Sequence, residues 1–289
     1  MKKLTLVTLG VATFGTLVLG AQQAFADAVQ PVANGEATVL FAADNDIELP
    51  PVVIPPVGEG DGGAINPDGS DGTPGDGDKS FNIAWVSHFR FNERNTEGAF
   101  KPIKLNANGM TLWAKGTKLT LDEVDKEGKL VEPVKSTVYN NIPNFVQVAD
   151  NRGALTGWNL SVQASPFVGK DGAENLELGG TKLSLNQPSI KGPAGIDLSS
   201  PLAPTTAVST GFEINGSPKN VMTANANAGV GSWSLKFGEE TKLQGAAYET
   251  LVEDTGVKLD IPASAKAKAG VEYKSTVKWI LSDAPYTAE

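Results

Sequence analysis

The sequence predicts an all-β protein, built as an antiparallel β-sandwich with long loops, with a β-barrel as the alternative. From Ser80 onward the apolar residues recur with a period of two, which is the period of a strand and not of a helix. Turn-forming sequences such as DNRG, GKDG, SPKN and EDTG separate these runs. No window of helical length shows an apolar face with caps at its ends. Many short strands in one domain are typical of sandwiches and barrels.

The first expected element is a secretory signal peptide at residues 1–26. Two lysines at positions 2 and 3 precede an uncharged apolar run at 4–19, and residues 24–26 (AFA) have the small-x-small pattern of a cleavage site. Because the run is short for a bilayer crossing, we expect cleavage before Asp27 and an exported protein. No second apolar span follows, so no transmembrane segment is expected in the mature chain.

A short segment and a linker are expected to follow the signal peptide. Residues 27–43 contain GEATVLFA (35–42), which has the composition of a single strand. Residues 44–78 are expected to be a disordered linker, because they are rich in Pro, Gly and Asp and hold too little apolar surface to offset the entropy of ordering. This linker carries nine acidic residues and no Lys or Arg.

The expected all-β domain spans residues 79–289. Its 22 basic and 22 acidic residues cancel, so it lacks the basic surface of a nucleic-acid-binding protein, and no nucleic-acid partner is expected. Residues 186–220 are rich in Pro, Gly and Ser and predict long loops. Strands are expected at 81–92, 117–121, 145–150, 157–163, 181–185, 232–237, 257–261 and 275–281.

The residues needed for catalysis are scarce. The chain has no Cys, which excludes thiolate chemistry and zinc sites made of thiolates. His88 is the single histidine, no G-x-S-x-G or H-E-x-x-H motif occurs, and His88 is interpreted as a surface or strand-edge imidazole. Acidic pairs adjacent in sequence point to opposite faces of a strand and make poor acid–base partners. We therefore expect no catalytic residue, no metal site, no cofactor and no enzymatic activity.

Two distant segments share the pattern Trp-x-Leu. In GWNLSVQ (157–163) the apolar side chains form one row and the polar ones face the other way, and VKWILSD (277–283) has a similar row. SWSLKF (232–237) has a third. Such rows are either core or an exposed aromatic strip that binds a partner. Both interpretations make the first two segments neighbouring strands.

The paired segments resemble the two motifs of the WxL domain, found on the surface of low-GC Gram-positive bacteria. The second copy, embedded in YKSTVKWILSDAP, is the specific part, and KSFNIAWVSHFRFN resembles the opening strand of that domain. The resemblance covers residues 79–289 and is closest to the small, single-domain members. It implies non-covalent attachment to the cell wall through peptidoglycan and assembly with other surface proteins. The binding residues that it implies are Trp158, Leu160, Trp279 and Leu281.

Two functions follow as hypotheses. The first is a secreted, non-catalytic cell-wall protein that binds peptidoglycan non-covalently through the Trp-x-Leu rows, which agrees with the absence of an LPxTG sorting signal. The second is a protein-interaction subunit of a surface complex, or an adhesin for host extracellular matrix, with the rows in the core and an edge strand as the binding element. Three lysines at 266, 268 and 274 are expected to lie on a solvated turn.

Overall fold

The computed structural model describes residues 52–53, 62–66, 70–75, 77–78, 80–93, 101–104, 106, 108–125, 129–193, 195–208, 211–239 and 253–283. All of them belong to one compact unit, Phe41–Glu289. The predicted signal peptide and the segment 27–43, with its expected strand, lie outside the described residues.

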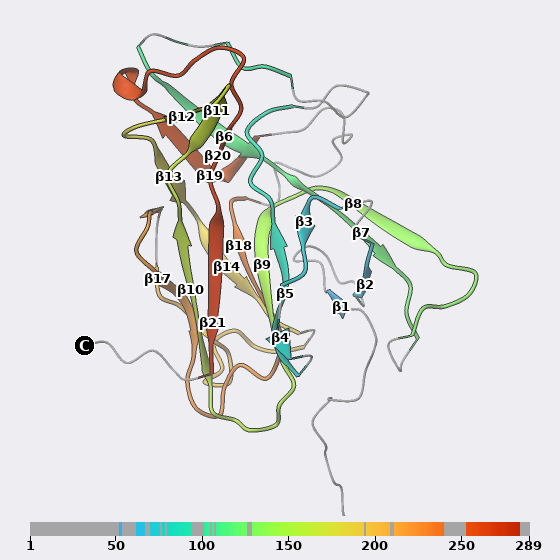
Figure 1. Ribbon diagram of the computed structural model, residues 1–289. Coiled ribbons are helices and arrows are strands. Elements are labelled where there is room, and N and C mark those ends of the chain that lie inside the picture. The colour runs from blue at the N-terminus through green and yellow to red at the C-terminus, as the bar shows by residue number, and fades with distance from the viewer. Residues whose placement is uncertain are drawn as a thin grey trace, which may run out of the picture. The chain divides into compact units, whose positions relative to one another are not determined.

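About half of the described residues form strands, which all pair antiparallel, and nearly all of the others lie in turns and loops (Figure 1). We name five sheets. The central sheet has the order β14-β18-β9-β5-β3, and β4 also pairs with β5. Its strands are β3 (Gly72–Thr73), β4 (Gly77–Asp78), β5 (Phe81–Ser87), β9 (Asn144–Asp150), β14 (Pro188–Lys191) and β18 (Gly231–Phe237).

The motif sheet contains both Trp-x-Leu segments of the predicted pair and has the order β15-β17-β10-β21. Its strands are β10 (Trp158–Ala164), β15 (Thr205–Thr206), β17 (Lys219–Ala224) and β21 (Val277–Ser282). The hairpin sheet has the order β1-β2-β7-β8, with β1 (Val52–Val53), β2 (Gly63–Ile65), β7 (Thr117–Asp122) and β8 (Ser136–Ile142).

Two further sheets lie beside these three. The pocket sheet has the order β16-β13-β19-β6, with β6 (Met110–Lys115), β13 (Lys182–Leu185), β16 (Phe212–Ile214) and β19 (Glu253–Ile261). The short sheet has the order β12-β11-β20, with β11 (Val168–Asp171), β12 (Glu174–Glu177) and β20 (Tyr273–Lys274). A single turn of 3-10 helix, η3 (Ala263–Ala265), follows β19.

The central sheet is covered on both faces, which explains why every residue of β9 is buried. On one face Val146 and Val148 join a core cluster that includes residues of the motif and pocket sheets. On the other face Phe145 stacks with Trp85, with ring centroids 6.2 Å apart, and both pack with the apolar residues of β7. Packed antiparallel sheets confirm the predicted sandwich. None of the sheets in the described residues closes on itself, so the barrel alternative is wrong.

Part of the predicted linker is attached to these sheets. Residues 44–78 contribute β1 to β4, and Asp71 forms a buried ion pair with Arg90. Strand β5 ends at Ser87, earlier than expected, and the backbone N–H of the next residue, His88, donates a hydrogen bond to the carbonyl of Asp71 in the same segment. The boundary of the domain at residue 79 stays a prediction.

The expectation of long loops at 186–220 is wrong at four places. Strands β14, β15, β16 and the start of β17 lie in this segment. Strand β14 starts with Pro188 and lies at the edge of the central sheet. An edge strand tolerates proline, because the backbone N–H groups on its outer side have no neighbouring strand to bond. Short edge strands need little apolar periodicity, so the sequence pattern does not reveal them.

Candidate functional site

The two Trp-x-Leu segments are neighbouring strands. Strands β10 and β21 pair antiparallel over their lengths, with Leu160 opposite Leu281 and Val162 opposite Trp279. Residues directly opposite in an antiparallel pair share a face, so the two apolar rows lie on the same face of the motif sheet. The expectation that both segments are strands in contact is therefore confirmed.

This face of the motif sheet points into the core. Trp158 and Leu160 are completely buried, whereas Trp279 and Leu281 are partly exposed. The ring of Trp279 stacks on Phe237 of the central sheet at a centroid distance of 6.2 Å. Trp158 and Leu160 thus lie in the core. The assignment of the four residues to ligand binding stays a prediction.

The indole of Trp158 supports a loop next to the motif sheet. Its Nε1 donates a hydrogen bond to the carbonyl oxygen of Gly229 at 3.0 Å, and the Nε1 of Trp233 donates to the carbonyl of Val230 at 3.0 Å. Gly229 has a φ of 78°, and a Cβ at this position would lie 2.4 Å from Nε1 of Trp158. Two of the Trp-x-Leu tryptophans therefore fix the backbone that connects β17 to β18.

Arg152 connects the start of β10 to the central sheet. Its guanidinium donates to both carboxylate oxygens of Asp150 at 2.9 Å and to the carbonyl of Gly157 at 3.2 Å, and it lies 3.6 Å from the ring centroid of Phe81. The hydrogen bond to Asp150 raises the pKa of Arg152 against the effect of burial, with further help from the charge of Asp283 just after β21. The sequence shows Arg152 only as part of a DNRG turn, so its role was missed.

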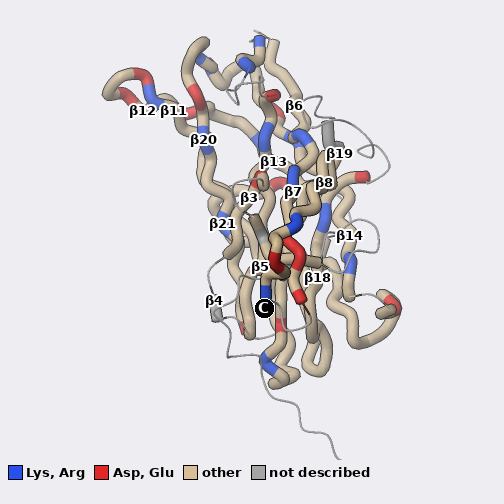
Figure 2. Tube along the Cα trace, turned by 90° about the vertical axis from the view of Figure 1, so that its right-hand side faces the viewer, with Lys and Arg blue, Asp and Glu red and all other residues tan. Residues whose placement is uncertain are grey.

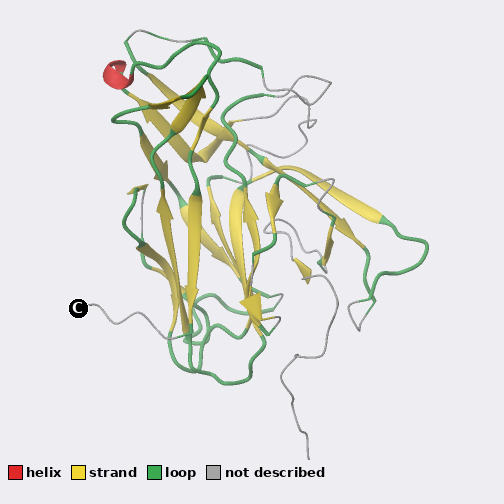
Figure 3. Ribbon diagram, viewed as in Figure 1, coloured by secondary structure: helices red, strands yellow, loops and turns green. Residues whose placement is uncertain are grey.

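Three loops meet at the end of the motif sheet where β10 begins and β21 ends (Figure 3). The backbone N–H of Asn227 donates to the carbonyl of Leu155, and that of Gly229 donates to the carbonyl of Leu202. Leu155, Leu202 and Val230 are exposed large apolar side chains on these loops. We call this surface the apolar loop end.

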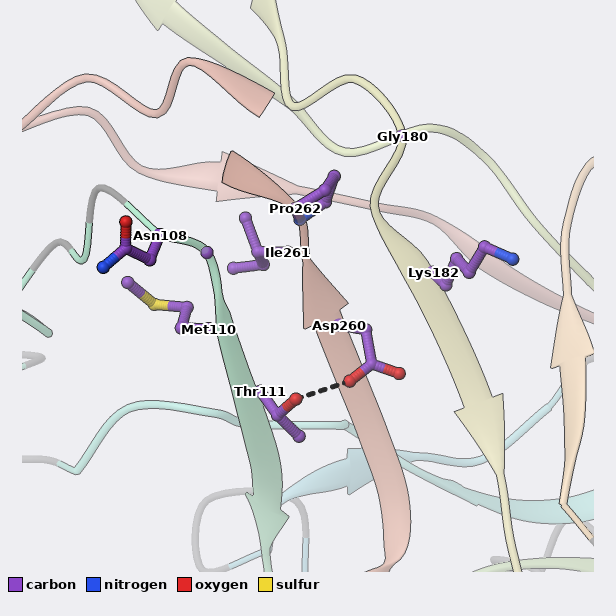
Figure 4. A pocket seen from close by; sticks show the side chains of 9 residues that line it. Asn108, Met110, Thr111, Gly180, Lys182, Asp260, Ile261 and Pro262 are labelled. Carbon is purple, nitrogen blue, oxygen red and sulfur yellow. Dashed lines mark hydrogen bonds between the residues drawn. The ribbon is translucent and has the colours of Figure 1, made fainter. Parts of the chain in front are cut away.

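A surface hollow of about 430 Å³ lies at one end of the pocket sheet (Figure 4). Asp260 is the one acidic residue among those that line the hollow. Its carboxylate accepts a hydrogen bond from Oγ1 of Thr111 at 2.6 Å and pairs with Lys258 at 2.8 Å. Burial disfavours the charged form, but the hydrogen bonds from Lys258 and Thr111 and the charges of Lys258 and Lys182 outweigh it, so the pKa of Asp260 lies below its ordinary value. This carboxylate is engaged in structural contacts.

The lysines expected on a solvated turn are exposed. Lys268 pairs with Asp171, and Lys274 pairs with Glu272 at 3.0 Å. Figure 2 shows acidic residues next to basic ones at β11, β12 and β20. The charges of two of the three lysines are therefore already balanced within the protein.

The remaining candidate features are the single histidine, metal-binding clusters and membrane-spanning helices. His88 is exposed and lies just after β5. Among the residues that the structure describes, no group of three or more His, Asp or Glu side chains is placed to hold a metal ion. The described helical structure also includes no helix with the length and apolar character to span a membrane.

Comparison with known families matches residues 28–285 to the WxL domain, described as surface cell wall-binding. The chain belongs to the WxL domain family. The match includes the segment 44–78, part of which pairs with the sheets described above. No curated protein and no solved structure matches the chain. The protein is thus a WxL surface protein located at the cell wall, and its family is one of wall binding and not of catalysis.

Proposed function

We propose that this WxL protein attaches non-covalently to peptidoglycan through the motif sheet. The observation that carries the proposal is the pairing of β10 with β21, which brings the two defining segments of a wall-binding family into one sheet. The polymer is peptidoglycan because it is the wall component to which the resemblance of the paired motifs points.

In this proposal the four motif residues act mainly from inside the sheet. Trp158 and Leu160 are completely buried, and each such side chain stabilises the fold by about 1.5 to 3 kcal/mol. Trp279 and Leu281 are partly exposed, so they both pack on the core and lie next to solvent. The motif then serves binding by fixing the strand pair and by presenting part of Trp279 at its margin.

The test is retention on purified peptidoglycan sacculi from which covalently attached polymers have been removed. We expect Trp279→Leu to lower retention of the mature protein. Trp113→Leu is the matched control, because Trp113 is also a partly exposed tryptophan but lies on β6, outside the motif sheet. Both variants must keep the wild-type circular dichroism. Equal retention of the two folded variants and the wild type would contradict a role for the motif, and a wild type that is not retained would contradict peptidoglycan binding.

A second candidate function is favoured by the apolar loop end. The core position of Trp158 and Leu160 and the exposure of Leu155, Leu202 and Val230 suit a protein-interaction module that binds another surface protein or host extracellular matrix. The test is surface plasmon resonance on immobilised collagen with the wild type and with Leu155→Ser/Leu202→Ser. Binding that these two exposed changes abolish would support the second function, and wild-type binding by the variant would refute it for this surface.

A further inference from the structure

The motif sheet has an outer face made mainly of uncharged polar residues. Along β10 the buried residues alternate with Asn159, Ser161 and Gln163, which are partly exposed. On β17 the residues opposite the first two of these, Thr223 and Asn220, are partly exposed as well. The face that does not contribute to the core is thus a hydrogen-bonding surface built by the same strands that carry the motif.

One row of this face crosses the whole sheet. Thr205 of β15 lies opposite Thr223, Thr223 lies opposite Asn159, and Asn159 lies opposite Ser282 of β21. Since neighbouring strands are about 4.8 Å apart, the four side chains span about 14 Å in a straight line. Three hydroxyls and one amide are therefore presented at regular intervals.

A second row lies beside the first. Asn220 lies opposite Ser161, and Ser161 lies opposite Ile280. Ile280 is partly exposed and adds a small apolar surface among the polar groups. Beyond it Gln163 lies opposite Lys278, which is the one charged residue that pairing places on this face in β10 and β21.

We infer that this outer face is the surface that binds the glycan strands of peptidoglycan, an inference that rests on the proposed function above. Hydroxyl and amide side chains both donate and accept hydrogen bonds, which matches the hydroxyl and N-acetyl groups of an amino-sugar polymer. The apolar side chain of Ile280 matches the C–H face or the acetyl methyl group of a sugar. A ligand-binding surface of this kind combines a few placed polar groups with apolar contact.

Two amide oxygens on the face have no hydrogen-bond partner. They are Oδ1 of Asn159 and Oδ1 of Asn220, although Nδ2 of Asn220 donates to Oγ1 of Thr223 at 2.8 Å. An unpaired, shielded acceptor is unfavourable in the free protein. In the inferred complex the side-chain amides turn toward the ligand, and sugar hydroxyls donate to these two oxygens.

The charges on the outer face favour the glycan strands as its ligand over the anionic polymers of a cell wall. An anionic chain is bound by several Lys or Arg side chains along its path. The rows above offer only Lys278, at the edge strand. A stem peptide would instead be bound at a pocket or by strand addition, whereas the rows lie on an open sheet face.

The experiment compares two double variants on sacculi and on glycan strands freed of stem peptides by an amidase. Asn159→Ala/Thr223→Ala removes two groups of the first row, and Thr137→Ala/Asn140→Ala is the control on exposed positions of β8. We expect the first variant to bind both ligands about tenfold more weakly, because each hydrogen bond is worth a few-fold in affinity. The control is expected to bind as the wild type does.

A second variant protects the test from a folding defect. Ser282→Arg adds bulk at the end of the first row, on the edge strand β21, without removing a core contact, and it is also expected to weaken binding. Wild-type affinity of both folded variants for sacculi would overturn the inference and leave the proposed function standing. Competition by free stem peptides, and none by glycan strands, would also overturn it. Failure of the wild type to bind sacculi would refute the proposed function itself.

Discussion

The contact between Trp158 and Gly229 gives a prediction with a built-in control. Gly229 has a φ of 78°, and an added Cβ would lie 2.4 Å from both Nε1 of Trp158 and Cβ of Ala224. Gly153, in the neighbouring loop, has a φ of 68° and no atom within 4 Å of the same added carbon. Replacing either glycine with alanine strains the backbone, but only Gly229→Ala disturbs the tryptophan.

The two substitutions should therefore differ in their effect on the free energy of unfolding. The left-handed conformation costs alanine about 1 kcal/mol at either site. At Gly229 the forced displacement of Trp158 adds about 1 to 3 kcal/mol for overpacking and about 1 kcal/mol for its hydrogen bond. We expect a destabilisation of about 1 kcal/mol for Gly153→Ala and about 3 to 5 kcal/mol for Gly229→Ala.

The assay is urea unfolding of both variants and the wild type at one pH, followed by tryptophan fluorescence and by circular dichroism. Coincident transitions in the two signals justify a two-state treatment. If the two variants differ by less than about 0.5 kcal/mol, which is the usual effect of a surface change, Trp158 does not hold the loop in the way the hydrogen bond indicates.

Three further predictions concern charge and exposure. Arg152→Met should destabilise the protein by about 3 to 5 kcal/mol, because it leaves the buried carboxylate of Asp150 unpaired; a loss below 1 kcal/mol in urea unfolding would contradict this. The folded-state pKa of Asp260 is lowered, so its stabilising effect is present above the ordinary value of 3.8 and is lost as the pH falls through its lower folded-state pKa. Asp260→Asn should thus be less stable than the wild type at pH 7, and the difference in their unfolding free energies should disappear in acid. A difference that does not change with pH would contradict this prediction. Trp113→Phe/Trp279→Phe should leave tryptophan fluorescence that iodide does not quench, since the other three tryptophans are completely buried; strong residual quenching would show that one of them is exposed.

Much of the fold could be predicted from the sequence because strand periodicity is local. The runs at 117–121, 145–150 and 232–237 became β7, β9 and β18 with nearly the expected bounds. The signal failed where a strand is short and lies at an edge, as for β14 to β16, and where a strand ends early, as β5 does at Ser87. Only part of the candidate site could be predicted from the sequence. Alternation showed that Asn159 and Ser161 oppose the Trp row, but nothing in the sequence marked Arg152 or Gly229 as its supports.

The sequence by itself determined that the chain is all-β, which side chains of each strand share a face, and that two distant segments carry the WxL motif, because each of these is a property of neighbouring residues or of residue type. Only the tertiary structure decided which face is buried. Alternation is symmetric with respect to the two sides of a sheet, so the row of Trp158 and Leu160 becomes core because the central sheet packs against it. The polar residues of the same strands are left at the surface for the same reason, and the site follows from that packing.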